Sequence, residues 1–278
     1  MNILAARRAA VARLAAAGVP DGAQDVAILL AHVLGASRAD LALLSPQTLL
    51  SPAQITAFEA AISARAARQP LSHITGQRLF WGRSFVVTPD VLDPRPETET
   101  LIAAALTHPF ASVLDLGTGS GCILLSLLAE RADARGVGVD ISAPALAVAA
   151  RNQARLGGSA EWAQGSWFDP VQGRFDLIVS NPPYIAADEM AALSPEVQGW
   201  EPHLALTPGG DGLAPYRTIS AAAPEYLTAG GRLLVEIGPS QGAAVTALFK
   251  AAGFERVEIL LDLDGRDRVV LGYLPNAV

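Results

Sequence analysis

The chain has 278 residues, of which 51% are hydrophobic and 17% are charged, so it can bury a real core and is not wholly disordered. Twenty-seven acidic residues outnumber 20 basic ones. The resulting net charge of −7 argues against a protein that binds nucleic acid through its phosphates. The single cysteine, Cys122, excludes internal disulfides, and four scattered histidines offer no metal-binding pattern. No apolar run nears the roughly 20 residues that span a bilayer, so we expect a cytoplasmic protein without membrane contact.

Residues 1–75 are predicted to form a small helical bundle. The first helix runs from about Ile3 to Ala17 and stops at a glycine with a proline just beyond it. A second helix can begin at Asp21. The clearest start signal is Ser51-Pro52-Ala53-Gln54, a capping-box pattern with proline at the first helical position.

Residues 76–93 differ from the preceding segment in their residue pattern and are predicted to form a β-hairpin or an extended linker. The stretch from Gln77 to Val87 alternates, is rich in aromatic residues and carries Gly82 at its middle. Three prolines, Pro89, Pro94 and Pro96, then precede a predicted helix from about Thr98 to Thr107. That helix belongs to the last predicted domain, residues 94–278.

Strands and helices alternate from Ser112 onward, which predicts an α/β fold: a mostly parallel, Rossmann-like sheet covered by helices on both faces. The expected strands are Val113–Leu116, Gly136–Val139, Phe175–Ser180, Arg232–Ile237, Val257–Leu261 and Val269–Tyr273. The expected helices are Cys122–Glu130, Pro144–Arg155 and Gln241–Ala252.

A glycine-rich loop, Gly117-Thr118-Gly119-Ser120-Gly121, follows the first of these strands and opens a helix. Alternating glycines let the backbone turn sharply and let a ligand approach it closely, although an ordinary strand-to-helix turn also favours glycine. The dinucleotide fingerprint G-x-G-x-x-G would need glycine where Cys122 stands, so a pyrophosphate ligand is disfavoured.

Asp140 ends the second strand, 19 residues beyond Gly121. A carboxylate at this place can accept hydrogen bonds from both hydroxyls of a ribose, and the alternative is that it caps the following helix. Loop and carboxylate together indicate an adenosine-bearing ligand that lacks a pyrophosphate. S-adenosyl-L-methionine meets this description.

The tetrapeptide Asn181-Pro182-Pro183-Tyr184 follows the third strand, at the sheet edge where ligands of open α/β folds bind. Two prolines fix φ near −65° and remove two backbone donors, which leaves carbonyl groups free to accept hydrogen bonds. With the Asn181 side-chain carbonyl and the Tyr184 ring, this makes a rigid pocket that suits a planar NH2 group. The pattern indicates amino-group methylation and does not choose between glutamine, adenine and guanine.

Taken in order, Pro94-Arg95-Pro96-Glu97-Thr98-Glu99, the glycine loop, Asp140 and Asn181–Tyr184 resemble the HemK/PrmC family. Members of this family are S-adenosylmethionine-dependent methyltransferases that modify the glutamine of the Gly-Gly-Gln (GGQ) motif in class 1 peptide chain release factors. The resemblance covers the predicted methyltransferase domain almost from end to end. Two departures, Asp93 and His73, fall where the family more often has an apolar residue and a tyrosine.

The resemblance implies specific roles for site residues. It implies cofactor contacts at Gly117, Thr118, Gly119, Ser120, Gly121, Asp140, Trp167 and Asn181, with the Trp167 ring near the adenine. Without the resemblance, Trp167 would be read as a core residue. It implies that Asn181, Pro182, Pro183 and Tyr184 are catalytic and bind the substrate glutamine, and it places Glu97 near the substrate.

The expected reaction is transfer of a methyl group from S-adenosyl-L-methionine to the glutamine side-chain nitrogen, with S-adenosyl-L-homocysteine as product and no metal. The expected protein is a monomer whose partner is a class 1 release factor, with no direct contact to nucleic acid. From the domain layout, we expect the helical bundle of residues 1–75 to be the substrate-recognition domain. The alternatives are methylation of a ribosomal-protein glutamine, or of adenine or guanine in nucleic acid. A further alternative is an adenosine-binding module that has lost turnover.

Overall fold

The computed structural model describes residues 1–276, leaving aside the side chain of Arg38. The chain forms two compact units. The first contains Met1–Gly76 and the short segment Ser194–Trp200, and the second contains Gln77–Leu193 and Glu201–Val278. No helix among residues 1–276 is long and apolar enough to cross a membrane.

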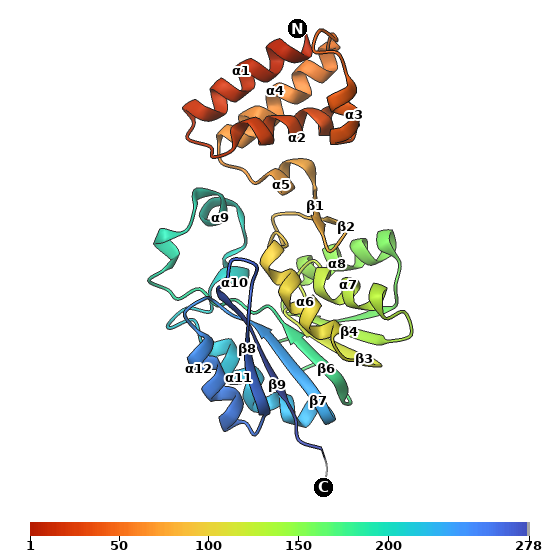
Figure 1. Ribbon diagram of the computed structural model, residues 1–278, viewed down its shortest axis with the longest axis vertical. Coiled ribbons are helices and arrows are strands. Elements are labelled where there is room, and N and C mark those ends of the chain that lie inside the picture. The colour runs from red at the N-terminus through yellow and green to blue at the C-terminus, as the bar shows by residue number, and fades with distance from the viewer. Residues whose placement is uncertain (277–278) are drawn as a thin grey trace. The chain divides into compact units, whose positions relative to one another are not determined.

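The first unit is helical, as the sequence predicts. Its helices are α1 (Ile3–Ala16), α2 (Gly22–Leu34), α3 (Arg38–Leu43), α4 (Pro52–Ala66), α5 (Leu71–Thr75) and α9 (Pro195–Trp200). Helices α1, α2 and α4 lie side by side around buried apolar side chains such as Leu29 and Phe58 (Figure 1). The predicted capping box is confirmed, because Ser51 Oγ accepts from the Gln54 N–H and Gln54 Oε1 accepts from the Ser51 N–H.

A β-hairpin opens the second unit. Strands β1 (Gln77–Phe80) and β2 (Arg83–Val86) pair antiparallel, as one of the two sequence interpretations proposed. The two turn residues, Trp81 and Gly82, both have positive φ (46° and 68°), which is typical of a tight hairpin turn. Phe80 and Phe85 are buried and meet edge to face, with ring centroids 6.0 Å apart.

The main sheet has seven strands in the order β5-β4-β3-β6-β7-β9-β8. The strands are β3 (Ser112–Leu116), β4 (Arg135–Asp140), β5 (Ala160–Gln164), β6 (Phe175–Ser180), β7 (Leu227–Glu236), β8 (Glu255–Leu261) and β9 (Asp267–Tyr273). The first five in spatial order are parallel, whereas β9 runs antiparallel to both of its neighbours. The prediction of a mostly parallel sheet is therefore confirmed.

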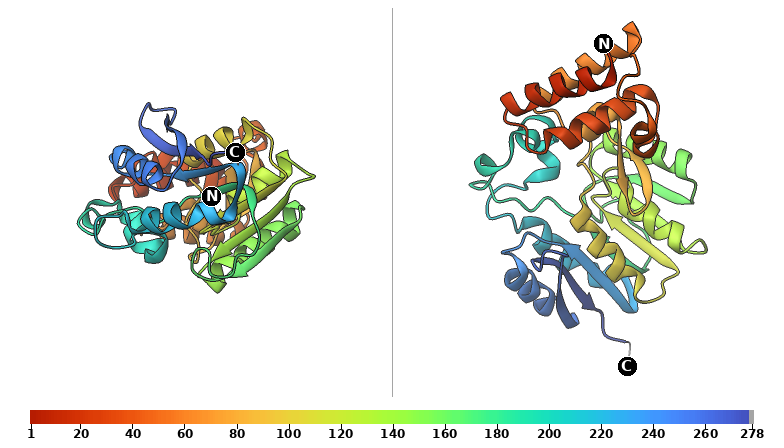
Figure 2. Two further views of the ribbon diagram at one scale, coloured as in Figure 1. Left: turned by 90° about the horizontal axis from the view of Figure 1, so that it is seen from below. Right: turned by 45° about the horizontal axis from the view of Figure 1, so that its top comes forward.

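Helices cover both faces of the sheet, and Figure 2 gives two further views of these layers. Helices α6 (Glu99–Leu106) and α7 (Cys122–Glu130) pack on one face, with α8 (Ala143–Leu156) beside α7. Helices α11 (Ala214–Tyr226) and α12 (Gly242–Ala251) pack on the other. Successive residues of β3 alternate between the two cores, because side chains of a strand point to opposite faces. The remaining short elements are η1 (Pro96–Thr98), η2 (Met190–Ala192) and α10 (His203–Leu206).

Besides the short elements, strand β5 and helix α11 of the second unit have no sequence prediction. Strand β5 lies at the sheet edge and is only partly buried, so its apolar pattern is weak. Helix α11 carries Pro215 in its first turn and Pro224 inside, and prolines usually indicate a helix break. Its burial against the sheet through Tyr216 and Ile219 outweighs that local signal.

Candidate active site

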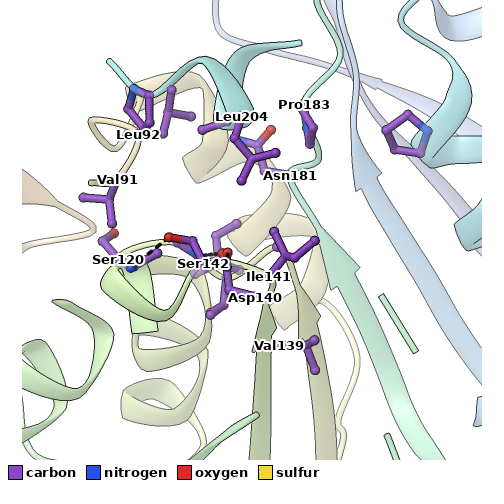
Figure 3. Close-up of a pocket in the computed structure, with 18 of the residues that line it drawn as sticks. Val91, Leu92, Ser120, Val139, Asp140, Ile141, Ser142, Asn181, Pro183 and Leu204 are labelled. Carbon is purple, nitrogen blue, oxygen red and sulfur yellow. Dashed lines mark hydrogen bonds between the residues drawn. The ribbon is translucent and has the colours of Figure 1, made fainter. Parts of the chain in front are cut away.

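Three neighbouring parallel strands, β4, β3 and β6, end at the same edge of the sheet. A cavity of about 350 Å³ lies in the second unit at this edge, lined by residues that follow each of the three strands. In Figure 3, Asn181, Pro183 and Leu204 lie on the side of the cavity opposite Asp140 and Ser142. The predicted motifs thus come together around one space, as expected for ligand sites of open α/β folds.

The glycine loop forms one wall of this cavity. Gly117, Gly119 and Gly121 all have positive φ (71°, 55° and 76°), a conformation that glycine adopts without steric strain. The loop is held to the sheet because the backbone N–H groups of Gly117 and Thr118 both donate to the Val139 carbonyl, at 2.8 and 3.0 Å. Gly117, Thr118, Gly119 and Ser120 line the cavity, whereas Gly121 faces Trp162 and Ala149.

Asp115, the residue two before the loop, is fully buried behind it. Its carboxylate accepts a 2.6 Å hydrogen bond from the Thr118 hydroxyl. Burial raises the pKa of Asp115 to about 7; the nearby charge of Asp140 also raises it, against the Thr118 hydrogen bond. From the sequence, no role is predicted for Asp115. In the structure it fixes the shape of the loop.

Asp140 faces the cavity and organises the backbone around it. Its Oδ2 accepts from the Gly119 N–H at 2.8 Å and its Oδ1 from the Ser142 N–H at 2.9 Å. The alternative reading of Asp140 as the helix cap is wrong, because Ser142 caps α8 by accepting from the Ala145 N–H. Each carboxylate oxygen can accept a second hydrogen bond, so Asp140 can still bind two hydroxyls. Burial raises its pKa.

Trp167 lies in the loop after β5 and lines the same cavity. Its backbone φ is 48°, which is unusual for a residue with a large side chain and is commonest where the surroundings impose it. The ring lies next to Gly117, so it borders the glycine loop while its other side packs on the core. A flat aromatic wall beside the loop suits a planar ligand ring.

The tetrapeptide leaves β6 in a fixed direction, because the Ser180 hydroxyl donates to the Leu116 carbonyl at 2.7 Å. Asn181 and Pro183 line the cavity, whereas Pro182 is buried and is not among its lining residues. The Asn181 side-chain amide donates through Nδ2 to the Thr98 hydroxyl at 3.3 Å. Tyr184 lies beyond the cavity, and its carbonyl accepts from Gln241 Nε2 at 2.9 Å.

A second cavity, of about 500 Å³, is lined by Tyr184, Glu97, Glu236 and Arg268. Arg95 lines both cavities. Burial raises the pKa of the Tyr184 hydroxyl well above its ordinary value, and burial also raises the pKa of Glu236 to about 7. The predicted substrate residues Tyr184 and Glu97 are therefore together, next to the cavity that holds Asn181.

The stretch from Pro94 to Glu99 is tied down by ion pairs and hydrogen bonds. Arg95 donates through Nη2 to both oxygens of the buried Glu201, at 2.6 and 2.8 Å. Glu99 accepts from the Trp81 backbone N–H at 2.7 Å and so braces the hairpin. Asp93, a departure from the family pattern, is buried 3.9 Å from Arg95 and 3.7 Å from Arg78. The other departure, His73, lies in α5 of the first unit.

Sequence reasoning missed the apolar part of the first cavity's lining. Val91, Leu92, Ile141 and Leu204 come from three different segments, and none carries a motif of its own (Figure 3). Leu204 and Ile141 are more than half exposed, as are several apolar side chains elsewhere in the described chain, so exposure alone could not have marked them as lining residues. Within the described chain, no cluster of three or more His, Cys, Asp or Glu side chains is arranged to hold a metal ion.

Comparisons with known proteins agree with these motifs. Residues 5–76 match the PrmC N-terminal domain, and residues 86–197 match the methyltransferase small domain. The release factor glutamine methyltransferase of Cereibacter sphaeroides is 60% identical over 279 aligned residues, covering all of both chains. That of Rhodospirillum rubrum is 46% identical over 93% of this chain and 81% of its own.

Among solved structures, a methyltransferase from Pyrococcus furiosus matches with a TM-score of 0.54 at 15% identity, over 69% of this chain and 88% of its own. The Thermus thermophilus 16S rRNA N2 G1207 methyltransferase matches with a TM-score of 0.51 at 18% identity, over 71% of this chain and 49% of its own. Both confirm the predicted methyltransferase-like fold. By its full-length relatives and its N-terminal domain, the chain belongs to the HemK/PrmC family of release factor glutamine methyltransferases.

Proposed function

We propose that this protein transfers a methyl group from S-adenosyl-L-methionine to the side-chain N5 nitrogen of the GGQ glutamine in class 1 peptide chain release factors. S-adenosyl-L-homocysteine is the other product. The observation that carries the proposal is the single cavity bordered by the glycine loop and Asp140 on one side and by Asn181 and Pro183 on the other. The identity of the substrate is inferred from two relatives, 60% and 46% identical, that bear the name release factor glutamine methyltransferase.

The residues of the first cavity fit an adenosine-bearing sulfonium. Its volume of about 350 Å³ lies within the range of small-molecule sites, roughly 300–1,000 Å³. The backbone at Gly119 faces open space, with no atom within 4 Å of where a Cβ would stand, so a ligand can lie directly on it. Asp140 would accept from the ribose hydroxyls, and Trp167 would border the adenine. The bound cofactor supplies an activated methyl group.

Positioning is the main task of the protein in this reaction. The amide nitrogen of glutamine is a weak nucleophile because its lone pair is delocalised into the carbonyl. Holding it in line with the methyl group can supply roughly 7–11 kcal/mol of the barrier. The Asn181 side-chain carbonyl and the backbone carbonyl of Pro182 would accept the two N–H groups of the substrate amide.

The same acceptors favour the transition state. As the substrate nitrogen attacks, it gains positive charge and its N–H groups become better hydrogen-bond donors. Acceptors fixed in place then bind the transition state more strongly than the ground state, which is the requirement for catalysis. Tyr184 would close one side of the glutamine pocket, and Glu97 would face the incoming chain from the second cavity. We propose that no metal takes part.

We propose that the helical domain of residues 1–75 recognises the release factor, that residues 76–93 link it, and that residues 94–278 carry catalysis. The first unit holds six arginines and five carboxylates, whereas the second holds 22 acidic against 14 basic residues. A basic surface of the partner would therefore be attracted to the catalytic unit, so the proposed recognition by the helical domain does not rest on its net charge. The excess of acidic residues argues against direct binding to nucleic acid. We also propose that the enzyme is monomeric and cytoplasmic.

The test is mass spectrometry of a purified class 1 release factor after incubation with the protein and S-adenosyl-L-methionine. The expected result is a gain of one methyl group on the glutamine of the Gly-Gly-Gln peptide. The matched control is a release factor in which that glutamine is replaced by alanine. No gain on the wild-type substrate, with cofactor binding intact, would reject the proposal in favour of a ribosomal-protein glutamine or a nucleic-acid base.

A further inference from the structure

Three side chains lie in a row that ends at the active site. Asn181 donates through Nδ2 to the Thr98 hydroxyl at 3.3 Å. The Thr98 hydroxyl also interacts with the carboxylate of Glu236, at the end of β7, and lowers its pKa, while Glu236 Oε2 has no hydrogen-bond partner among the described residues. Thr98 is 2% exposed and Glu236 is 1% exposed, so water competes little for either group.

The Thr98 hydroxyl has no competing local task. Thr98 stands just before α6, where a threonine commonly caps a helix, yet its side chain makes no capping hydrogen bond. Its backbone turn, η1, is instead held by the Thr98 N–H, which donates to the Arg95 carbonyl at 3.1 Å. The buried hydroxyl of Thr98 is therefore available to interact with Asn181 and Glu236.

The direction of the row follows from the chemistry of its three groups. An ionised carboxylate can only accept, so the hydroxyl of Thr98 must donate its one proton to Glu236. The hydroxyl oxygen then has only lone pairs to offer to Asn181, and it must face the NH2 end of that amide. The carbonyl oxygen of Asn181 is left as the end available to a ligand in the cavity.

We infer that Thr98 and Glu236 are positioning residues that orient the Asn181 amide so that its carbonyl, and not its NH2 group, meets the substrate nitrogen. This inference rests on the proposed function, because only a substrate that donates N–H groups needs an acceptor there. If the Asn181 amide were reversed, its NH2 group would face the NH2 group of the substrate glutamine, and the hydrogen bond between Asn181 and the substrate would be lost.

Protonation of Glu236 reverses the row. A neutral carboxyl can donate to Thr98, whose own proton then turns toward Asn181 and favours the reversed amide. The charges that face Glu236 come from several elements: Arg268 and Arg95 favour its ionised form, and Glu97 opposes it. Tyr184 and Cys122 also face it and are neutral near pH 7, because burial raises the pKa of each, that of Cys122 to about 12. The pKa of Glu236, about 7, places this switch inside the working pH range.

The experiment compares Thr98→Val, Thr98→Ser and Glu236→Gln with the wild type, with release factor and S-adenosyl-L-methionine as substrates. Thr98→Val should lower kcat about 10- to 100-fold, because the acceptor is no longer held in place. Cofactor affinity should stay within about threefold, since the glycine loop and Asp140 stay intact. Thr98→Ser should restore most of kcat. The matched controls are Thr100→Val, two residues along, and Glu225→Gln on the exposed side of α11.

The pH profile separates positioning from a merely structural role. Wild-type kcat should fall as the pH is lowered through about 7, and Glu236→Gln should lack this acid limb. An acid limb that persists in Glu236→Gln would overturn the inference and assign the limb to Asp115, whose pKa is also about 7. Equal kcat in Thr98→Val and the wild type would overturn it as well.

A third measurement needs no turnover, so it separates this inference from the proposed function. The carboxyl carbon of Glu236 can be followed by nuclear magnetic resonance during a pH titration. Because the Thr98 hydroxyl lowers the pKa of Glu236, Thr98→Val should raise that pKa above the wild-type value. No change would remove the hydrogen bond on which the row depends. Absence of methyl transfer by the wild type, with this shift intact, would reject the proposed function alone.

Discussion

The orientation of one side-chain amide decides what the cavity can do. Asn181 sits at the end of β6 with its NH2 group on Thr98, and the two prolines after it prevent the backbone from rearranging around a substrate. In the proposed reaction, the Asn181 carbonyl is therefore in place as an acceptor before the substrate arrives. Preorganised groups of this kind need little reorganisation during the reaction, which is why they stabilise a transition state more than flexible ones do.

Asn181→Ala should remove most of the rate and little of the cofactor binding. We expect kcat to fall about 100-fold or more, the usual effect of losing a preorganised hydrogen-bonding group. Cofactor affinity should fall much less, because the glycine loop and Asp140 stay intact. Single-turnover kinetics and calorimetric titration with the cofactor measure the two effects. Asn276→Ala, at an exposed asparagine, is the control, and unchanged turnover in Asn181→Ala would contradict the assignment.

Asp140→Ala should show the opposite pattern. The carboxylate accepts from the backbone of Gly119 and of Ser142, so its loss loosens the glycine loop as well as removing the acceptor for the ribose. We expect the affinity for S-adenosyl-L-methionine to fall about 10- to 100-fold, the loss of one or two hydrogen bonds to a charged group. Isothermal titration calorimetry checks this against Asp169→Ala, which changes an exposed carboxylate. Equal affinities would show that Asp140 makes no ligand contact.

At the scale of elements, the parts predictable from sequence are those with their own local signal. The glycine loop, Asp140 and the Asn181 tetrapeptide each follow a strongly apolar strand, so chain order and sheet geometry bring them together. Strand β5 and helix α11 lack such a signal, and tertiary packing decides both. The pairing of Thr98 with Asn181 joins residues 83 positions apart and depends on how η1 meets the sheet edge, which no local pattern contains.

The segment after the tetrapeptide contributes one helix to the first unit. Helix α9 is held there by Glu196, which pairs with Arg65 at 3.0 Å and with Arg68 at 2.8 Å. Arg65 also pairs with the buried Asp25 at 2.6 Å. Both arginines hydrogen-bond Glu196 and so lower its pKa, against the effect of burial. One buried arginine thus joins three elements, α2, α4 and α9.

Arg65→Met should destabilise the first unit by about 3 kcal/mol or more, because it leaves the buried Asp25 without its cation and the partly buried Glu196 with Arg68 alone. The methionine keeps the apolar stem, so the loss reports on charge and not on packing. Chemical denaturation followed by circular dichroism checks the change, with the exposed Arg7→Met as the control. A midpoint equal to that of the control would show that solvent compensates the two carboxylates.

At the scale of the whole molecule, buried acids set how stability depends on pH. Asp115 and Glu236 are both almost fully buried, and burial raises the pKa of each to about 7 from ordinary values of 3.8 and 4.5. The pKa values of Asp140 and Glu201 are raised in the same direction and for the same cause. The groups with lowered pKa, among them Asp211 and Asp262, are already ionised above pH 4.5 and add no slope there.

The folded chain therefore binds protons more tightly than the unfolded chain between about pH 4.5 and pH 7. Since stability falls with rising pH wherever the folded state holds more protons, the free energy of unfolding should drop across this interval, by on the order of 3 kcal/mol for each of Asp115 and Glu236. Thermal denaturation without ligand should give a higher Tm at pH 5.5 than at pH 8. Glu236→Gln should flatten the slope, whereas Glu225→Gln should not.

Stability is expected to fall with rising pH, whereas kcat for the proposed reaction is expected to rise. Turnover needs Glu236 ionised so that Thr98 accepts from Asn181, whereas folding is most favourable when Glu236 is neutral. Optimal activity should then lie above pH 7, on the less stable side of the molecule, which is common where a buried charge serves a site. Parallel measurement of kcat and Tm from pH 5.5 to pH 8.5 tests the coupling. A Tm that rises together with kcat as the pH is raised would mean that folding does not raise the pKa of Glu236.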